Sequence, residues 1–189
     1  NFLAGITSSL VAWIGGTYLI GDTPTSAGYS WTFLLAFVLT SIGLLMLIAV
    51  DEPEPPTVKT KQSLLQRMGE VPGLLREDSA FTRYFIARSI ATMGRMAMPF
   101  YILYAGQSIG LTGQTLGILT FAFTISGTFS NLFWGYVADR KGFRLTFLMS
   151  IFLWLASTVL LMLVDHYVVT IFVFVGIGAA VQGFNNSSQ

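Results

Sequence analysis

The sequence of 189 residues contains no cysteine and only one histidine, His166. Without cysteine, disulfide bonds and thiolate metal sites are excluded. A single histidine makes a histidine-based metal centre unfavourable, because structural and catalytic zinc sites draw several ligands from these residue types. We therefore expect neither a metal ion nor another cofactor.

Charged side chains are also scarce. They make up 10% of the residues, whereas hydrophobic residues make up 53% and the mean hydropathy is +0.69. A soluble domain carries about 25% charged residues, so this chain has too little polar surface to be soluble. We expect an all-α integral membrane protein whose environment is the lipid bilayer, with no nucleic-acid partner.

Long apolar runs alternate with short polar breaks along the chain. Because a hydrocarbon core about 30 Å thick needs about 20 helical residues, these runs predict six transmembrane helices, of which the first and last are incomplete. We therefore expect the chain to be a fragment of a longer membrane protein. The runs cover residues 1–20, 29–50, 80–105, 114–138, 143–164 and 167–189.

Residues 51–79 form the only long polar segment. The segment begins with DEPEPP, whose prolines prevent a helix from continuing. Leucines and other apolar residues then recur at helical spacing, which predicts short amphipathic pieces on the membrane surface, interrupted at Pro72. Asp78 or Ser79 can cap the helix that follows, since either side chain can accept from free backbone N–H groups.

Among the connections between the runs, only alternate ones carry lysine and arginine. They occur in 51–79 and in a hairpin at 138–144, and the breaks at 21–28, 106–113 and 165–166 contain none. Cytoplasmic connections carry the excess of basic residues, so we expect the linker and the hairpin to be cytoplasmic. We expect the membrane to be the plasma (inner) membrane.

The hairpin has a distinctive sequence, GYVADRKGFR, at residues 135–144. Its glycine at 142 allows a tight turn at positive φ without a Cβ clash. The stretch resembles the G-x-x-x-D-R-x-G-x-R signature of the major facilitator superfamily, although Phe143 replaces a basic residue that is usual there. The residues that carry the resemblance are Gly135, Asp139, Arg140, Gly142 and Arg144.

This resemblance implies a partial major facilitator fold, with six of an expected twelve transmembrane helices. In that family the signature follows the second helix and, in a more degenerate form, the eighth. Since helices and a long cytoplasmic linker precede the hairpin, the chain resembles helices five to ten. Residues 1–50 then end the N-terminal half, 51–79 form the central linker, and 80–189 begin the C-terminal half.

The motif residues also have a physical interpretation. Asp139 can accept from free N–H groups at a neighbouring helix N-terminus, and Arg140 and Arg144 can pair with carboxylates or phospholipid head groups. Gly135 is expected to let the helices on either side of the hairpin approach closely. The resemblance implies that these contacts form a conformational latch. The alternative is a basic turn that only sets orientation.

Beyond Arg83 near its start, the third apolar run contains two further arginines. Arg88 and Arg95 are seven residues apart with Thr92 between them, so all three share a helical face. Arg95 lies about 18 Å beyond Arg83, near mid-membrane, where an arginine costs at least about 2.5–3.5 kcal/mol. We expect Arg95 to contact substrate or a coupling carboxylate, with a structural ion pair as the alternative. Arg88 can instead snorkel towards the cytoplasm.

Further polar and helix-bending residues lie in the predicted spans. Pro99 is expected to kink its helix, and Tyr101 and Tyr104 to belong to an outer interface belt. No acidic residue lies within a span, which favours an anionic or amphipathic substrate and leaves any coupling ion to residues elsewhere. Four amide side chains either line the cavity or bond neighbouring helices: Asn131, Gln182, Asn185 and Asn186.

The resemblance implies a secondary active transporter that moves a small solute by alternating access. An intramembrane enzyme is not expected, because the spans contain no histidine pair, no carboxylate pair and no G-x-S-x-G motif. A receptor or sensor that keeps the transporter fold without transporting is the alternative that the sequence leaves open.

Overall fold

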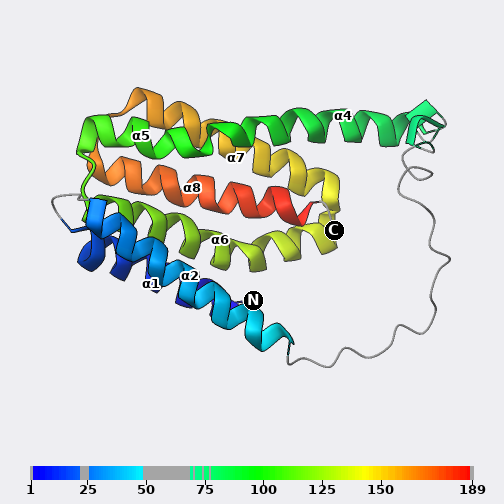
Figure 1. Ribbon diagram of the computed structural model, residues 1–189. Helices are drawn as coiled ribbons and strands as arrows, with labels where there is room; N and C mark the ends of the chain where they lie inside the picture. The colour runs from blue at the N-terminus through cyan, green and yellow to red at the C-terminus, as the bar shows by residue number, and fades with distance from the viewer. Residues whose placement is uncertain are drawn as a thin grey trace. The chain divides into compact units, whose positions relative to one another are not determined.

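The computed structural model describes residues 2–21, 26–48, 69, 71–73, 75–76 and 78–187, and every element in these ranges is a helix (Figure 1). Residues 51–68, with the prolines at 53, 55 and 56 and the start of the predicted amphipathic stretch, lie outside the described residues. Pro72, where an interruption was predicted, lies in a helical stretch at 71–73. The elements are α1 (Phe2–Ile14), the π-helix η1 (Gly15–Ile20), α2 (Ser26–Ile48), α4 (Ser79–Gly94), the 3₁₀-helix η2 (Arg95–Ala97), α5 (Met98–Ile109), α6 (Gly113–Lys141), α7 (Phe143–Leu163) and α8 (Tyr167–Asn186).

Five helices in the described part of the chain are long and apolar enough to cross a membrane. They are α1 together with η1, and α2, α6, α7 and α8. This confirms the all-α membrane class predicted from composition. The remaining apolar run, 80–105, is also helical, but it is divided into α4, η2 and α5. None of these three pieces reaches the length of a span on its own.

Pro99 explains why that run is divided. In a regular α-helix the N–H of residue 99 would donate to the carbonyl of Arg95, but proline has no N–H. The N–H of Met98 donates to the carbonyl of Arg95 instead, in the tighter 3₁₀ pattern. The irregularity therefore lies one turn before the proline that was expected to kink the helix.

The described chain divides into two compact units, which we treat separately. The first consists of Asn1–Phe37 and Pro99–Gln189, and the second of Val38–Met98. In the second unit, the Oδ1 of Asp78 accepts from the N–H groups of Ala80 and Phe81 at 2.9 and 3.0 Å. The predicted N-cap of α4 is thereby confirmed.

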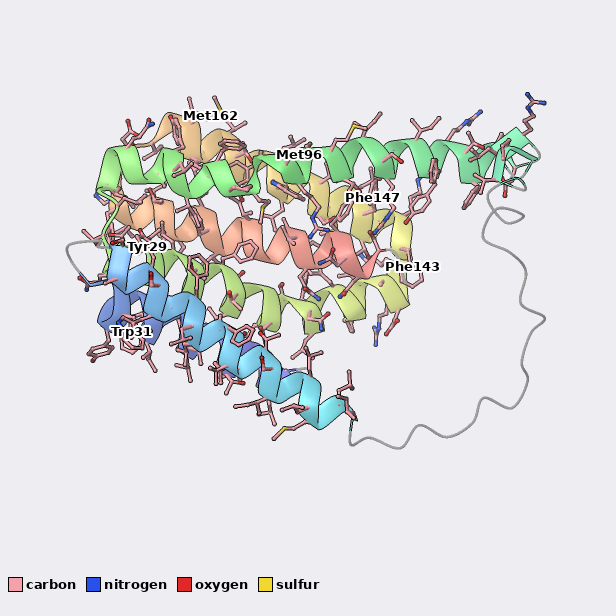
Figure 2. All side chains as sticks on the ribbon, in the orientation of Figure 1. Tyr29, Trp31, Met96, Phe143, Phe147 and Met162 are labelled. Atoms are coloured by element: carbon pink, nitrogen blue, oxygen red, sulfur yellow. The ribbon has the colours of Figure 1, made fainter. Side chains whose placement is uncertain are left out.

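The core of the first unit lies around α8, which packs against both α6 and α7 (Figure 1). Phe184 and Ile177 of α8 are fully buried. Phe147 of α7, labelled in Figure 2, packs on Phe184 with 5.7 Å between ring centroids. Met162, labelled near the other end of α7, is exposed.

Glycines let the helices of the first unit approach at backbone distance. A Cβ on Gly178 of α8 would lie 2.1 Å from the carbonyl oxygen of Phe123 on α6. A Cβ on Gly16 of η1 would lie 2.5 Å from the Cα of Gly117. The N–H of Gly113 donates to the carbonyl of Gly21 at 2.8 Å. Close packing of small residues is the main source of helix association in lipid.

Tyr101 joins α5 to α7. Its hydroxyl bonds the Oγ1 of Thr158 at 3.1 Å and accepts from the Nε1 of Trp154, also at 3.1 Å. The hydroxyl of Tyr101 is thus used between helices, and its predicted place in an outer interface belt stays a prediction. Tyr104, one turn further on, is exposed.

Candidate functional site

A pocket of about 270 Å³ lies between α1, α6 and α8 of the first unit. Its wall combines hydroxyl, amide and aromatic side chains, and no charged residue is among those described around it. We call it the amide pocket. It is lined by Phe2, Phe123, Thr124, Gly127, Thr128, Asn131, Leu132, Gly178, Val181 and Gln182.

Three of the four amides predicted from sequence are connected at this pocket. The Nδ2 of Asn186 donates to the Oδ1 of Asn131 at 2.6 Å. The Nε2 of Gln182 donates to the Oδ1 of Asn186 at 3.3 Å. Gln182 and Asn186 lie one turn apart on α8, so a chain of hydrogen bonds joins α8 to α6. The cluster is therefore compatible with both hypotheses from the sequence, that these amides line a cavity and that they bond neighbouring helices.

Two polar atoms of the amide cluster remain available for hydrogen bonding. Within the described residues, neither the Nδ2 of Asn131 nor the Oε1 of Gln182 has a hydrogen-bond partner. An amide nitrogen carries two donor hydrogens and an amide oxygen accepts. The pocket can therefore offer one donor group and one acceptor group to a small polar molecule.

Two threonines of α6 line the pocket and were not identified from the sequence. The hydroxyl of Thr124 donates to the carbonyl of Thr120 at 2.8 Å, and that of Thr128 to the carbonyl of Thr124 at 2.9 Å. Their donors are used within the helix, while the oxygens can still accept. Thr124, Thr128 and Asn131 are spaced by four and three residues, which is the signal that could have found them.

Glycines determine where the pocket forms. Gly127 of α6 and Gly178 of α8 both line it, and a Cβ on Gly127 would lie 3.4 Å from the carbonyl oxygen of Gly178. Phe2, which also lines the pocket, packs edge-on against Phe129, with 5.2 Å between ring centroids. Backbone and aromatic side chains therefore form part of the wall.

The fourth predicted amide, Asn185, is half-buried on α8 and is not among the residues that line the pocket. It lies one residue from Asn186, which is about 100° around the helix. Asn185 is therefore outside the lining of the amide pocket.

The helical face predicted to carry Arg88, Thr92 and Arg95 belongs to the second unit. Arg88 is half-buried, and its Nη1 donates to the hydroxyl of Tyr84 at 3.1 Å. The Oγ1 of Thr92 donates to the carbonyl of Arg88 at 2.8 Å, so its donor is used within α4. Arg95 is exposed and begins the 3₁₀ segment η2.

The hairpin between α6 and α7 turns at a single residue. Gly142 has φ +87° and ψ 157°, a backbone conformation that is essentially limited to glycine. Its N–H donates to the carbonyl of Ala138 at 3.0 Å, and its carbonyl accepts from the Oγ1 of Thr146 at 3.3 Å. The tight turn at positive φ predicted from sequence is confirmed.

The other motif residues make fewer contacts than expected. The guanidinium of Arg140 lies 4.7 Å from the centre of the Tyr136 ring, a cation–π contact. Asp139 is exposed and, among the described residues, has no hydrogen-bond or ion-pair partner. A Cβ on Gly135 would meet no described atom within 4 Å. The close helix approach predicted at Gly135 is therefore not found, and the close approaches occur at Gly16 and Gly178 instead.

Comparison with known families gives one result. The model of the Major Facilitator Superfamily matches residues 84–188, which is more than half of the chain and extends from α4 through α8. Comparison with curated proteins and with solved structures gives no match.

Proposed function

Because the chain belongs to the major facilitator superfamily, a family of membrane transporters, we propose that it works in secondary active transport of a small solute. Such proteins expose one midplane site alternately to the two sides of the membrane as two helical halves rock around it. The observation that supports this proposal most strongly is the family match, together with the uncharged polar pocket inside a bundle of membrane-spanning helices.

The arrangement proposed for the chain follows from the hairpin. Residues 1–50 provide the fifth and sixth helices, 51–79 the central linker, and 80–189 the seventh to tenth helices. The basic residues of the linker and of 138–144 support a cytoplasmic position for both, in a plasma (inner) membrane.

We propose that the amide pocket forms part of the substrate site. A solute that carries both hydroxyl or carbonyl acceptors and donors would match the Nδ2 of Asn131 and the Oε1 of Gln182. Asn131 is exposed and Gln182 is half-buried in this chain, so both groups are accessible to a bound molecule. The same two groups therefore favour a hydrogen-bonding solute over an apolar one of equal size.

Arg95 and Arg88 are proposed to bind an anionic group of the substrate or a coupling carboxylate, and Thr92 lies between them in the sequence. An arginine far from the ends of a spanning run is costly in hydrocarbon, which favours a polar partner for Arg95. The exposure of Arg95 within this chain supports contact with a substrate, water or another helix.

The hairpin is proposed to act as a conformational latch. Gly142 imposes a turn that presents Asp139, Arg140 and Arg144 together at one end of α6 and α7. Asp139 is exposed, which leaves it accessible to a helix N-terminus in another part of the transporter.

Reconstitution of the full chain into liposomes tests transport and the role of the amide pocket together. We expect saturable flux of a small polar solute, reduced by about tenfold in Gln182→Met, which keeps side-chain length and removes one hydrogen bond. Gln107→Met is the matched control, because Gln107 is exposed on α5 and does not line the pocket. Equal flux in wild type and Gln182→Met would remove the pocket from the site. Saturable binding without flux of any tested solute would favour the receptor alternative.

A further inference from the structure

A second, larger hollow lies on another side of the first unit. It has a volume of about 570 Å³ and is formed by α6, α7 and α8. Its lining is apolar apart from Ser130, whose hydroxyl donates to the carbonyl of Gly127 within the same helix at 3.1 Å. The transport proposal makes no use of this hollow, which we call the apolar groove.

The apolar groove and the amide pocket are lined by different residues of α6. Phe133, in the wall of the groove, follows Asn131 by two residues and therefore points about 200° around α6 from it. In a transporter the polar side of a spanning helix faces the solute cavity. The side of α6 that carries Phe133 then faces hydrocarbon.

The groove has a rigid floor and open walls. The ring of Trp134 forms the floor, is only 3% exposed, and is held by a 2.7 Å bond from its Nε1 to the carbonyl of Ala179. Phe133 on α6 and Phe152 on α7 form the walls and are 53% and 74% exposed. A flexible chain could lie along the floor between these rings.

Both walls of the groove lead to basic side chains at the hairpin. On α6, Phe133 and Arg140 are seven residues apart, and on α7, Arg144 and Leu148 are four apart. These spacings keep the members of each pair on one helical face. Figure 2 labels Phe143 at this end of α7, between the two arginines in sequence. Lys141 adds a third positive charge, and Asp139 is the one acidic side chain of the hairpin.

We propose that the apolar groove and the hairpin together bind an anionic phospholipid. An acyl chain lies over Trp134 between the aromatic walls, and the phosphate lies between Arg140 and Arg144. Basic pockets between spanning helices on the cytoplasmic side suit anionic head groups, and the hairpin is the end of the groove that carries such charge. The net charge of the hairpin selects an anionic lipid over a zwitterionic one.

Fluorescence quenching of Trp134 by lipids brominated in the acyl chain tests this proposal. The full chain is prepared with Trp13, Trp31 and Trp154 replaced by phenylalanine and reconstituted with brominated phosphatidylglycerol or brominated phosphatidylcholine. We expect phosphatidylglycerol to quench Trp134 at a lower mole fraction. Each basic residue near the surface contributes about fivefold in affinity, so Arg140→Gln with Arg144→Gln reduces the preference by up to about 25-fold.

Arg83→Gln is the matched control, because Arg83 is an exposed arginine on α4 that does not belong to the hairpin. This variant keeps the preference. Native mass spectrometry of the unmodified full chain gives a second readout, in which phosphatidylglycerol is retained and phosphatidylcholine is not. Equal quenching by the two lipids, quenching by neither, or a preference that survives the double substitution overturns the proposal.

Discussion

The side-chain nitrogen of Asn186 donates to the side-chain oxygen of Asn131 over 2.6 Å and joins α8 to α6 beside the amide pocket. A second bond, from Gln182 to Asn186, occupies the oxygen of the Asn186 amide. The relative position of two spanning helices and the hydrogen-bonding pattern of the pocket thus depend on the same amide.

Asn186→Leu separates these two roles. Hydrogen bonds between helices in a membrane contribute on average about 0.6 kcal/mol and at most about 1.7, so we expect only a small fall in thermal stability. Transport should fall by about tenfold or more, because the Asn131 oxygen and the Gln182 nitrogen lose their partner and reorient. Unfolding in detergent and flux in liposomes measure the two effects.

Ser126→Ala is the control for Asn186→Leu. Its hydroxyl also bonds α8, at the carbonyl of Val175, but Ser126 does not line the amide pocket. This variant should lose similar stability and keep its transport rate. A matching loss of transport would mean that helix bonding, and not the pocket, is what Asn186 supplies.

Arg95→Ala should insert normally and lose solute uptake, since removing a charge from a spanning run lowers the cost of insertion. Arg95→Lys should recover part of the activity, because lysine keeps the charge and loses the planar guanidinium fork. Membrane fractionation and flux in liposomes are the measurements. Arg83→Ala, which removes an arginine nearer the start of α4, should transport at the wild-type rate. Wild-type uptake in Arg95→Ala contradicts the proposed role.

Gly16→Ala should destabilise the protein, whereas Gly15→Ala should not. A Cβ on Gly16 would lie 2.5 Å from the Cα of Gly117 and 2.6 Å from the carbonyl oxygen of Gly113. Both are backbone atoms, so we expect a cost of about 1–3 kcal/mol from overpacking. A Cβ on Gly15 meets no described atom within 4 Å. The thermal unfolding midpoints of the two variants, measured in the same detergent, provide the comparison, and equal midpoints would contradict the close approach.

Gly142→Ala should destabilise the hairpin by about 1–3 kcal/mol, the usual range for a non-glycine residue held in a glycine-only conformation. Gly135→Ala is the control for Gly142→Ala, because Gly135 is helical and open space surrounds its Cβ position. We expect no loss of stability there, or a small gain from the better helix propensity of alanine. Destabilisation by Gly135→Ala would restore the packing role first predicted for it.

Local features were predictable from the sequence because they depend on a few neighbouring residues. The length of the apolar runs predicted the spans. A carboxylate before an apolar run predicted the helix cap at Asp78, and a glycine between two helices predicted the turn at Gly142. The expected irregularity near Pro99 follows from one missing N–H.

Contacts between helices were harder to predict, because in lipid both the packed and the lipid-facing sides of a helix are apolar. The face that meets a neighbour then carries no hydrophobic signature. Gly135 was chosen for its place in a motif, while Gly16 and Gly178 make the close approaches. Tyr101 was assigned to the interface by residue type, and its hydroxyl bond to Thr158 was not predicted. The sequence indicated Thr124 and Thr128 only through their helical spacing to Asn131.

The bond from Met98 to the carbonyl of Arg95 has a mechanical consequence. Since residue 99 can never donate, the chain has no regular α-helical state to return to at this point. The stretch from Arg95 to Pro99 therefore has one backbone hydrogen bond fewer than an uninterrupted α-helix and is less constrained. One of the two points at which the chain passes between the compact units lies here, between Met98 and Pro99. The proline therefore places a locally weakened helix at this point.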